Sequence, residues 1–281
     1  MSTRSMNILI QGRPDTGKTT YLVQLYLRLR HAGQRRRGLR LARGSDTAAL
    51  RDELSDIAQG RRPQHTSSEI FRNITLHLTD DAGRELSIPW PDYGGEQLDQ
   101  IITHRALSRA WIERARDADA WLLFIRPKIL KTYPDRLAAL VTKDAPTSRD
   151  APPDVGWDDN ATTVKCVQLM LDAARVPVQD RVRSPRLAVV LSCWDELDEP
   201  CARPSDELAR RLPMVAEYLA ATWAPSAYSV WGLSSLGKPL ARDESDDAYL
   251  DEGPEAHGSV ILPDGAKDSN LTRPLAWLIA R

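Results

Sequence analysis

Short, strongly apolar runs recur along the chain and alternate with longer stretches whose apolar positions have helical spacing. The runs are typical of buried strands and lie at residues 6–11, 119–126, 186–193 and 227–232. The longer stretches predict helices at residues 19–30, 46–59, 99–116, 161–175, 205–223 and 269–281. Strands that alternate with helices in this way favour an α/β fold with a mostly parallel sheet.

Two further strands are predicted at residues 73–80 and 85–91. Asp81-Ala82-Gly83-Arg84 joins them as a hairpin-type turn, so we expect one antiparallel pair at the edge of the sheet. Two segments follow neither pattern. Residues 143–160, rich in Pro, Asp and Thr, predict an exposed loop, and residues 236–268 predict a mobile insertion that can hold a short strand at 259–262.

Length and composition favour a soluble single-domain protein over a nucleic-acid-binding or membrane protein. With 281 residues, the chain is interpreted as a single domain over 1–281, with insertions at about 128–160 and 236–268. A formal net charge of -1 argues against a nucleic-acid partner. The three cysteines lack metal-ligand spacing and favour a reducing compartment. No signal peptide or membrane-spanning run is recognised, so we expect a soluble, cytoplasmic protein.

Candidate chemistry begins directly after the first strand. Gly12-Arg13-Pro14-Asp15-Thr16-Gly17-Lys18-Thr19 matches the phosphate-loop pattern GxxxxGK[ST] between a predicted strand and a predicted helix. The glycines let backbone N–H groups approach phosphate oxygens, and the helix start turns its positive end toward the anion. Lys18 can reach the β- and γ-phosphates in catalysis, and the Thr19 hydroxyl can bind Mg²⁺. The pattern, with the adjacent Thr20, therefore predicts a nucleoside triphosphate site.

A second phosphate-type motif, Asp92-Tyr93-Gly94-Gly95, lies where the second hairpin strand ends. Asp92 there can hold Mg²⁺ through water, and the Gly95 N–H can meet a γ-phosphate oxygen. The alternative is a tight turn that uses glycines. The next residue, Glu96, can orient an attacking water, or it is a solvated surface acid.

Thr66 lies in the loop that precedes the hairpin. Its hydroxyl can close over Mg²⁺ when a γ-phosphate is present, which would order residues 60–70. A hydroxyl turn or a helix cap is the structural alternative, and Ser67 and Ser68 compete for the same role.

Two loops after later strands are candidates for binding a base. Asp195 follows the strand at 186–193, and a carboxylate there can accept hydrogen bonds from N1–H and N2–H₂ of guanine, which adenine does not offer. A helix cap or surface acid is the alternative. Ser234 and Ser235 follow the next strand, where backbone N–H groups can contact the guanine O6.

The ordered set GRPDTGKT, Thr66, DYGGE, SCWD and GLSS resembles the motifs of translation-factor- and Ras-related P-loop GTPases, the TRAFAC class. More narrowly, the chain resembles bacterial double-GTPase (DO-GTPase) domains, which are linked to conflict and defence systems. The resemblance implies a three-layer sandwich that binds GTP or GDP with Mg²⁺ and hydrolyses GTP as a molecular switch. By resemblance, the Mg²⁺ ligands are Thr19, Thr66 and Asp92, and the guanine contacts are Asp195 and Ser234.

Two motifs depart from the family pattern. In the base-binding motif SCWD, which is the fourth motif of the set, Cys193 replaces a lysine that packs on the base in relatives. In DYGGE, Glu96 replaces a glutamine, so intrinsic hydrolysis can be slow. An ATP-dependent phosphotransferase and a nucleotide-binding scaffold without turnover are the alternative functions. The arginine-rich stretch 28–43 is a solvated basic face or supplies an arginine finger in a nucleotide-dependent dimer. No motif identifies the effector or activating protein.

Overall fold

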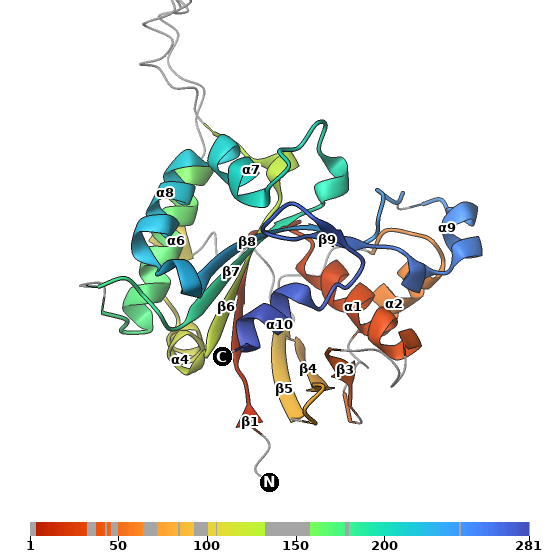
Figure 1. The fold of residues 1–281 in the computed structure, drawn as a ribbon, viewed down its shortest axis with the longest axis horizontal. Helices are drawn as coiled ribbons and strands as arrows, with labels where there is room; N and C mark the ends of the chain where they lie inside the picture. Colours follow the sequence, from red (N-terminus) through yellow and green to blue (C-terminus); the bar gives the residue numbers. More distant parts are fainter. Residues whose placement is uncertain are drawn as a thin grey trace, which may run out of the picture.

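The strands of the computed structural model build a sheet whose centre is parallel. The structure describes residues 4–32, 38–42, 44–45, 50–63, 72–83, 85–92, 101–104, 106–132, 158–177, 180–241 and 243–280. Six strands lie in the order β10-β9-β8-β7-β6-β2 (Figure 1). The four parallel ones are β2 (Ile8–Gln11), β6 (Ala120–Ile125), β7 (Arg186–Ser192) and β8 (Tyr228–Ser234). The antiparallel edge consists of β9 (Ser259–Ile261) and β10 (Lys267–Asp268).

The predicted hairpin is confirmed in a second sheet of four strands, ordered β1-β5-β4-β3. Its strands are β1 (Arg4–Ser5), β3 (Arg40–Leu41), β4 (Arg72–Thr79) and β5 (Glu85–Asp92). The strands β4 and β5 pair antiparallel over their full lengths, and β5 runs parallel to β1. Because only two residues separate β1 from β2, the hairpin adjoins the parallel sheet beside β2.

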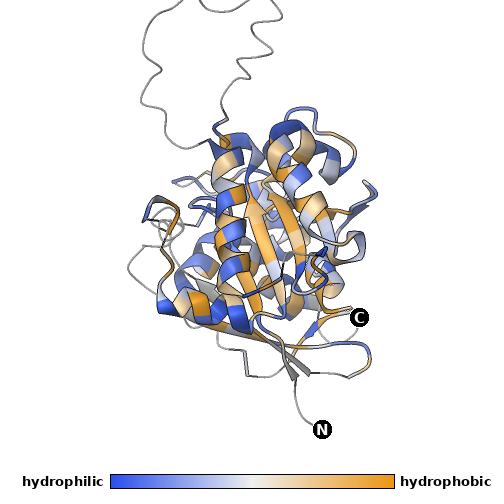
Figure 2. Cartoon of the chain, turned by 90° about the vertical axis from the view of Figure 1, so that its left-hand side faces the viewer, coloured by the Kyte–Doolittle hydropathy of each residue, from blue (hydrophilic) through white to orange (hydrophobic). Residues whose placement is uncertain are grey.

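Helices cover both faces of the sheet and give three layers (Figures 1 and 2). Alternate residues of β6 enter two separate apolar cores: Leu122 and Phe124 face one, Trp121 and Leu123 the other. The first core lies under α1 (Lys18–Ala32), α2 (Arg51–Ala58) and α10 (Arg273–Ile279). The second lies under α4 (Arg109–Asp117), α6 (Asp159–Ala173), α7 (Pro204–Arg211) and α8 (Pro213–Thr222). The predicted α/β sandwich is therefore confirmed.

Two predicted helices are interrupted. The stretch 205–223 forms α7 and α8 because Pro213 has no N–H and restricts the residue before it; Leu212 adopts φ -134° and ψ 67°. Within 99–116, residues 101–104 are helical, and α4 starts anew at Arg109. The Ser108 hydroxyl caps that second start by accepting a hydrogen bond from the Trp111 N–H.

The segment 236–268, which the sequence predicts to be a mobile insertion, is instead folded against the first core. The segment holds α9 (Asp247–Glu252), the short helix η6 (Pro254–Ala256) and β9, which confirms the short strand near 259–262. Leu240, Tyr249 and Val260 are buried in the first core. The buried Arg28 of α1 donates hydrogen bonds to the carbonyls of residues 256–258 and 269. Arg28 therefore anchors this segment and is no part of a solvated basic face.

The other loop prediction, residues 143–160, lies largely outside the described residues, apart from its last three, where α6 begins. Short 3-10 helices at η3 (Pro127–Ile129), η4 (Trp194–Glu196) and η5 (Pro225–Ala227) lie next to the central strands. None of the described helices is both long and apolar enough to cross a membrane.

Candidate functional site

The carboxyl ends of β2, β6, β7 and β8 lie at one edge of the sheet because these neighbouring strands are parallel. Each strand leads there into a short connection, at Gly12, Arg126, Cys193 and Ser235 respectively. Ligands of open α/β sheets bind at this edge. The predicted phosphate loop and the predicted base loops therefore meet on one side of the molecule.

The phosphate loop curls tightly between β2 and α1. Gly12 lies against its own loop and β6, since a Cβ there would be 2.7 Å from Thr16 Oγ1 and 2.9 Å from Phe124 Cβ. Gly17 (φ 75°) and Asp15 (φ 58°) adopt left-handed conformations. The first turn of α1 carries no acidic residue, so its positive end is free to face an anion.

The Lys18 ammonium lies inside the curl. The residue is buried, and its Nζ donates hydrogen bonds to the carbonyls of Gly12 at 2.7 Å and Arg13 at 2.9 Å. Thr16 Oγ1 lies 3.3 Å from the same Nζ. Thr19 and Thr20, half-buried, follow on the first turn of α1. The predicted cation and hydroxyls are thus assembled around one small loop.

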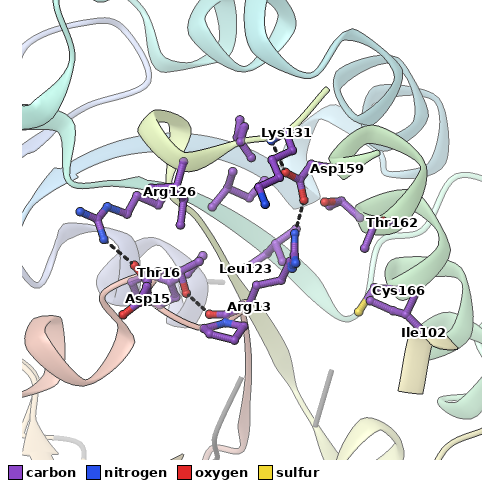
Figure 3. A pocket seen from close by; sticks show the side chains of 17 residues that line it. Arg13, Asp15, Thr16, Ile102, Leu123, Arg126, Lys131, Asp159, Thr162 and Cys166 are labelled. Carbon is purple, nitrogen blue, oxygen red and sulfur yellow. Dashed lines mark hydrogen bonds and ion pairs between the residues drawn. The ribbon is translucent and has the colours of Figure 1, made fainter. Parts of the chain in front are cut away.

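The side chain of Arg13 leaves the loop and ion-pairs with Asp159, the first residue of α6 (Figure 3). Asp159 is buried and also accepts a hydrogen bond from the Lys131 N–H. A cavity of about 360 Å³ lies between the phosphate loop, the end of β6 and α6. Among the described residues, the Thr162 hydroxyl in its wall has no hydrogen-bond partner.

The connection after β7 forms the candidate base loop. Cys193 is left-handed (φ 51°), and η4 follows it. Trp194 packs on Gly232, where a Cβ would lie 2.7 Å from the indole Cε3, so only glycine leaves room for this ring. Asp195 is half-buried, and its carboxylate makes no hydrogen bond or ion pair with any described residue. An unused carboxylate at this edge can accept hydrogen bonds from a ligand.

The predicted serines end β8 beside this loop. Ser234 and Ser235 are buried, and Ser234 Oγ accepts a hydrogen bond from the Gly237 N–H at 3.0 Å. The Ser234 hydroxyl therefore shapes the turn after β8. The contact between a base and the backbone groups of these two residues stays a prediction.

Arg126 lies between the two loops. One guanidinium nitrogen donates to the Asp15 carbonyl at 3.0 Å, and the other two donate to the Glu196 carboxylate at 2.9 and 2.6 Å. Arg62 reaches the Asp15 carboxylate at 3.8 Å. Burial works against the charge of Arg126, but the hydrogen bonds to Glu196 and the nearby acids keep its pKa above the usual value. Burial raises the pKa of the Cys193 thiol to about 12.

Sequence comparison identifies the family of this chain. A family model described as Double-GTPase 1 matches residues 9–278. The chain belongs to the Double-GTPase 1 family. The match covers both the phosphate loop and the base loops, so the resemblance inferred from the motifs is confirmed. A search among curated proteins finds no matching sequence.

Two solved structures resemble the double-GTPase at low identity. The Arl6 BBS3 small GTPase from Trypanosoma brucei, with bound nucleotide analogue GppNp, is 14% identical, with 83% of this chain and 88% of that chain covered and a TM-score of 0.37. The bacterial selenocysteine-specific elongation factor EF-Sec is 12% identical, with 82% of this chain and 25% of that chain covered and a TM-score of 0.36.

Part of the predicted site lies beyond the residues that the structure describes. Thr66 falls within 64–71, and Gly95 and Glu96 fall within 93–100. Asp92 is the last residue of β5, and its backbone ends that strand at the hairpin next to β2. Within the described part of the double-GTPase, no cluster of three His, Cys, Asp or Glu side chains forms a metal site.

Sequence reasoning missed the side chains that link the loops of the double-GTPase. Arg126 is the first residue after a strongly apolar strand, as are Gly12 and Cys193. This shared position is the sequence signal that could have identified Arg126 as a site residue. Glu196 lies next to the predicted Asp195, and Asp159 was assigned to an exposed loop. Their partners become visible only when the order of the strands is known.

Proposed function

We propose that this double-GTPase binds GTP and GDP at the carboxyl edge of its parallel sheet and hydrolyses GTP to GDP and phosphate. The buried Lys18 ammonium inside a loop at the start of α1 carries the proposal. The carbonyls of Gly12 and Arg13 accept hydrogen bonds from this ammonium. Phosphate oxygens are stronger partners for it because they are charged, so a bound triphosphate would replace those carbonyls.

Guanine selectivity is assigned to Asp195. Its carboxylate has no partner among the described residues and lies at the same sheet edge as the phosphate loop. It can accept hydrogen bonds from both N1–H and N2–H₂ of guanine, whereas adenine would leave it buried without donors. We assign the contact with the guanine O6 to the backbone N–H groups of Ser234, the last residue of β8, and of Ser235, which follows it.

The donor set also suits Mg²⁺. The Thr19 hydroxyl stands next to Lys18 on α1, and Asp92 ends a strand that adjoins β2, so both offer the hard oxygen ligands that Mg²⁺ prefers. We assign Thr66 as the third ligand from its motif alone. When bound, Mg²⁺ neutralises negative charge on the β- and γ-phosphates.

For hydrolysis, Lys18 stabilises charge on the phosphates while Glu96 or a partner protein orients water in line with the γ-phosphorus. The water oxygen forms a bond to that phosphorus as the bond to the β–γ bridging oxygen breaks, which leaves GDP and inorganic phosphate. We further propose that the nucleotide state switches a partner protein, in a bacterial setting such as a conflict or defence system.

Titration calorimetry with GTP, GDP and ATP in the presence of Mg²⁺ tests the binding site. Lys18→Ala should weaken GTP binding by at least about 100-fold, which corresponds to roughly 2.7 kcal/mol. Lys267→Ala, a change to an exposed lysine on the far strand β10, is the matched control and should bind as the wild type does. Undiminished binding by a folded Lys18→Ala variant would remove the proposed phosphate site.

Phosphate release under single-turnover conditions tests hydrolysis separately. Release from GTP and not from ATP supports the GTPase. Turnover of ATP with phosphate transferred to another molecule would favour a phosphotransferase, and binding without any release, with and without candidate partners, would favour a scaffold.

A further inference from the structure

We infer that Arg126 is a positioning residue that ties the phosphate loop to the base loop and supplies the positive charge that the fourth motif lacks at Cys193. The inference rests on the proposed function, because it assigns a role within the same guanine nucleotide site. Arg126 lies outside all of the family motifs.

Strand order places Arg126 where it can serve both loops. The strand β6 lies between β2, which leads into the phosphate loop, and β7, which leads into the base loop. All three run parallel, so the residue that leaves the carboxyl end of β6 emerges between the two loops. Arg126 is that residue, and only about a tenth of its side chain is exposed (11%).

The contacts of Arg126 use its planar fork in two directions. Toward the phosphate loop, Nη1 donates to the Asp15 carbonyl at 3.0 Å. Toward the base loop, Nε and Nη2 donate to the two oxygens of Glu196, the residue after Asp195, at 2.9 and 2.6 Å. A bidentate arginine–carboxylate pair is both strong and geometrically specific. Figure 3 shows the contact of Arg126 with Asp15. Together with the pair to Glu196, this contact ties the phosphate loop to the residue that follows Asp195.

Charge explains why a second cation is needed here. Cys193 lies beside the phosphate loop, since a Cβ on Gly17 would be 3.8 Å from its Sγ. A thiol whose pKa is raised by burial stays neutral, so Cys193 does not supply the charge of the lysine it replaces. Arg126 is near enough to act electrostatically on Cys193 and brings a permanent charge to the same place.

The expected consequence is a loss of base discrimination rather than a general loss of binding. Without Arg126, the Glu196 carboxylate would have no counter-charge and would lie next to the Asp195 carboxylate. Two neighbouring carboxylates repel each other, so the base loop would move away from the position in which Asp195 can accept hydrogen bonds from guanine. Lys18 and the phosphate loop would still hold the phosphates.

The test compares binding of GDP with that of inosine diphosphate, which lacks only the 2-amino group that Asp195 is proposed to read. We expect the wild type to prefer GDP by about tenfold or more, because a hydrogen bond to a carboxylate contributes roughly 1.5–3 kcal/mol. Arg126→Ala and Glu196→Ala should each bring the ratio toward one. The double variant should be no worse than either single variant, since both remove one interaction.

Arg210→Ala is the matched control, because it breaks another bidentate arginine–glutamate pair, with Glu207, within α7. Its GDP preference should equal that of the wild type even where its melting temperature falls.

If Arg126→Ala does not fold, Arg126→Lys provides the test. One ammonium cannot make both sets of contacts, so this variant should also lower the ratio. The inference is overturned if a folded Arg126 variant keeps the wild-type ratio of GDP to inosine diphosphate affinity. It is also overturned if the double variant loses as much preference as the product of the two single losses. A wild type that prefers neither nucleotide overturns the proposed guanine site itself.

Discussion

Single residues at the candidate site differ in how their charges are used. Lys18 and Arg126 donate hydrogen bonds to groups of the protein itself, which holds the loops together. Asp195 has no such partner among the described residues. Its half-exposed carboxylate is therefore available to the guanine ligand that we propose.

Asp195→Asn should exchange guanine for xanthine selectivity. The amide retains one acceptor and gains donors, so it loses the pair of hydrogen bonds from guanine and can donate to the 2-oxo group of xanthine. We expect GDP binding to weaken about 10–100-fold and xanthosine diphosphate binding to improve, as measured by calorimetry. Asp198→Asn, a change three residues along to an exposed carboxylate, is the control and should alter neither affinity. Equal GDP binding by wild type and Asp195→Asn would contradict the assignment.

Individual elements show which features the sequence could predict. The phosphate loop is contiguous, so one motif predicts it, and the apolar patterns on either side predict the flanking strand and helix. Arg126 was missed because its role depends on β6 lying between β2 and β7, an order that no local pattern encodes. The segment 236–268 was misread because its polar composition conceals the buried Tyr249 and Val260. The break before Pro213 was available from the sequence, since a proline inside a helical pattern usually ends it.

The helix α7 should lose stability in acid through Glu207. Its side chain is fully buried, and although burial opposes the charge, hydrogen bonds from the Cys201 N–H, Arg210 and Arg211 lower its pKa. A carboxyl with a lowered folded-state pKa stabilises the fold above its unfolded pKa of about 4.3, and that contribution is lost as the pH falls through the folded value.

Glu207→Gln should therefore lower the free energy of unfolding at pH 7 by about 1–3 kcal/mol and have a smaller effect near pH 3. Urea denaturation across this pH range measures the difference. Glu217→Gln, at an exposed position on the neighbouring helix α8, serves as the control. A loss of stability that is the same at pH 3 and pH 7 would show that ionisation of Glu207 is not the cause.

In the whole molecule, parallel strands bring loops from distant parts of the chain to one edge of the sheet, so the proposed nucleotide would contact all of them. The phosphate loop comes from the first residues of the fold, whereas the base loops follow β7 and β8. Arg28, on the helix that begins at the phosphate loop, also anchors the segment that precedes α10. Nucleotide binding should therefore stabilise the chain as a unit and not one loop at a time.

This coupling predicts a single, ligand-dependent melting transition. GDP at 100 times its dissociation constant should add about 2.7 kcal/mol to the free energy of unfolding, which for a chain of this size corresponds to a rise in melting temperature of roughly 5–10 °C. The two apolar cores can report on it separately, because Trp121 and Trp223 pack edge to face in one and Trp231 and Trp277 in the other. Variants that keep only one of these pairs, with all other tryptophans replaced by phenylalanine, let fluorescence follow each core, and both should melt together and shift equally with GDP. Lys18→Ala should abolish both shifts. Two separate transitions, or a shift confined to one core, would show that the ligand stabilises only part of the fold.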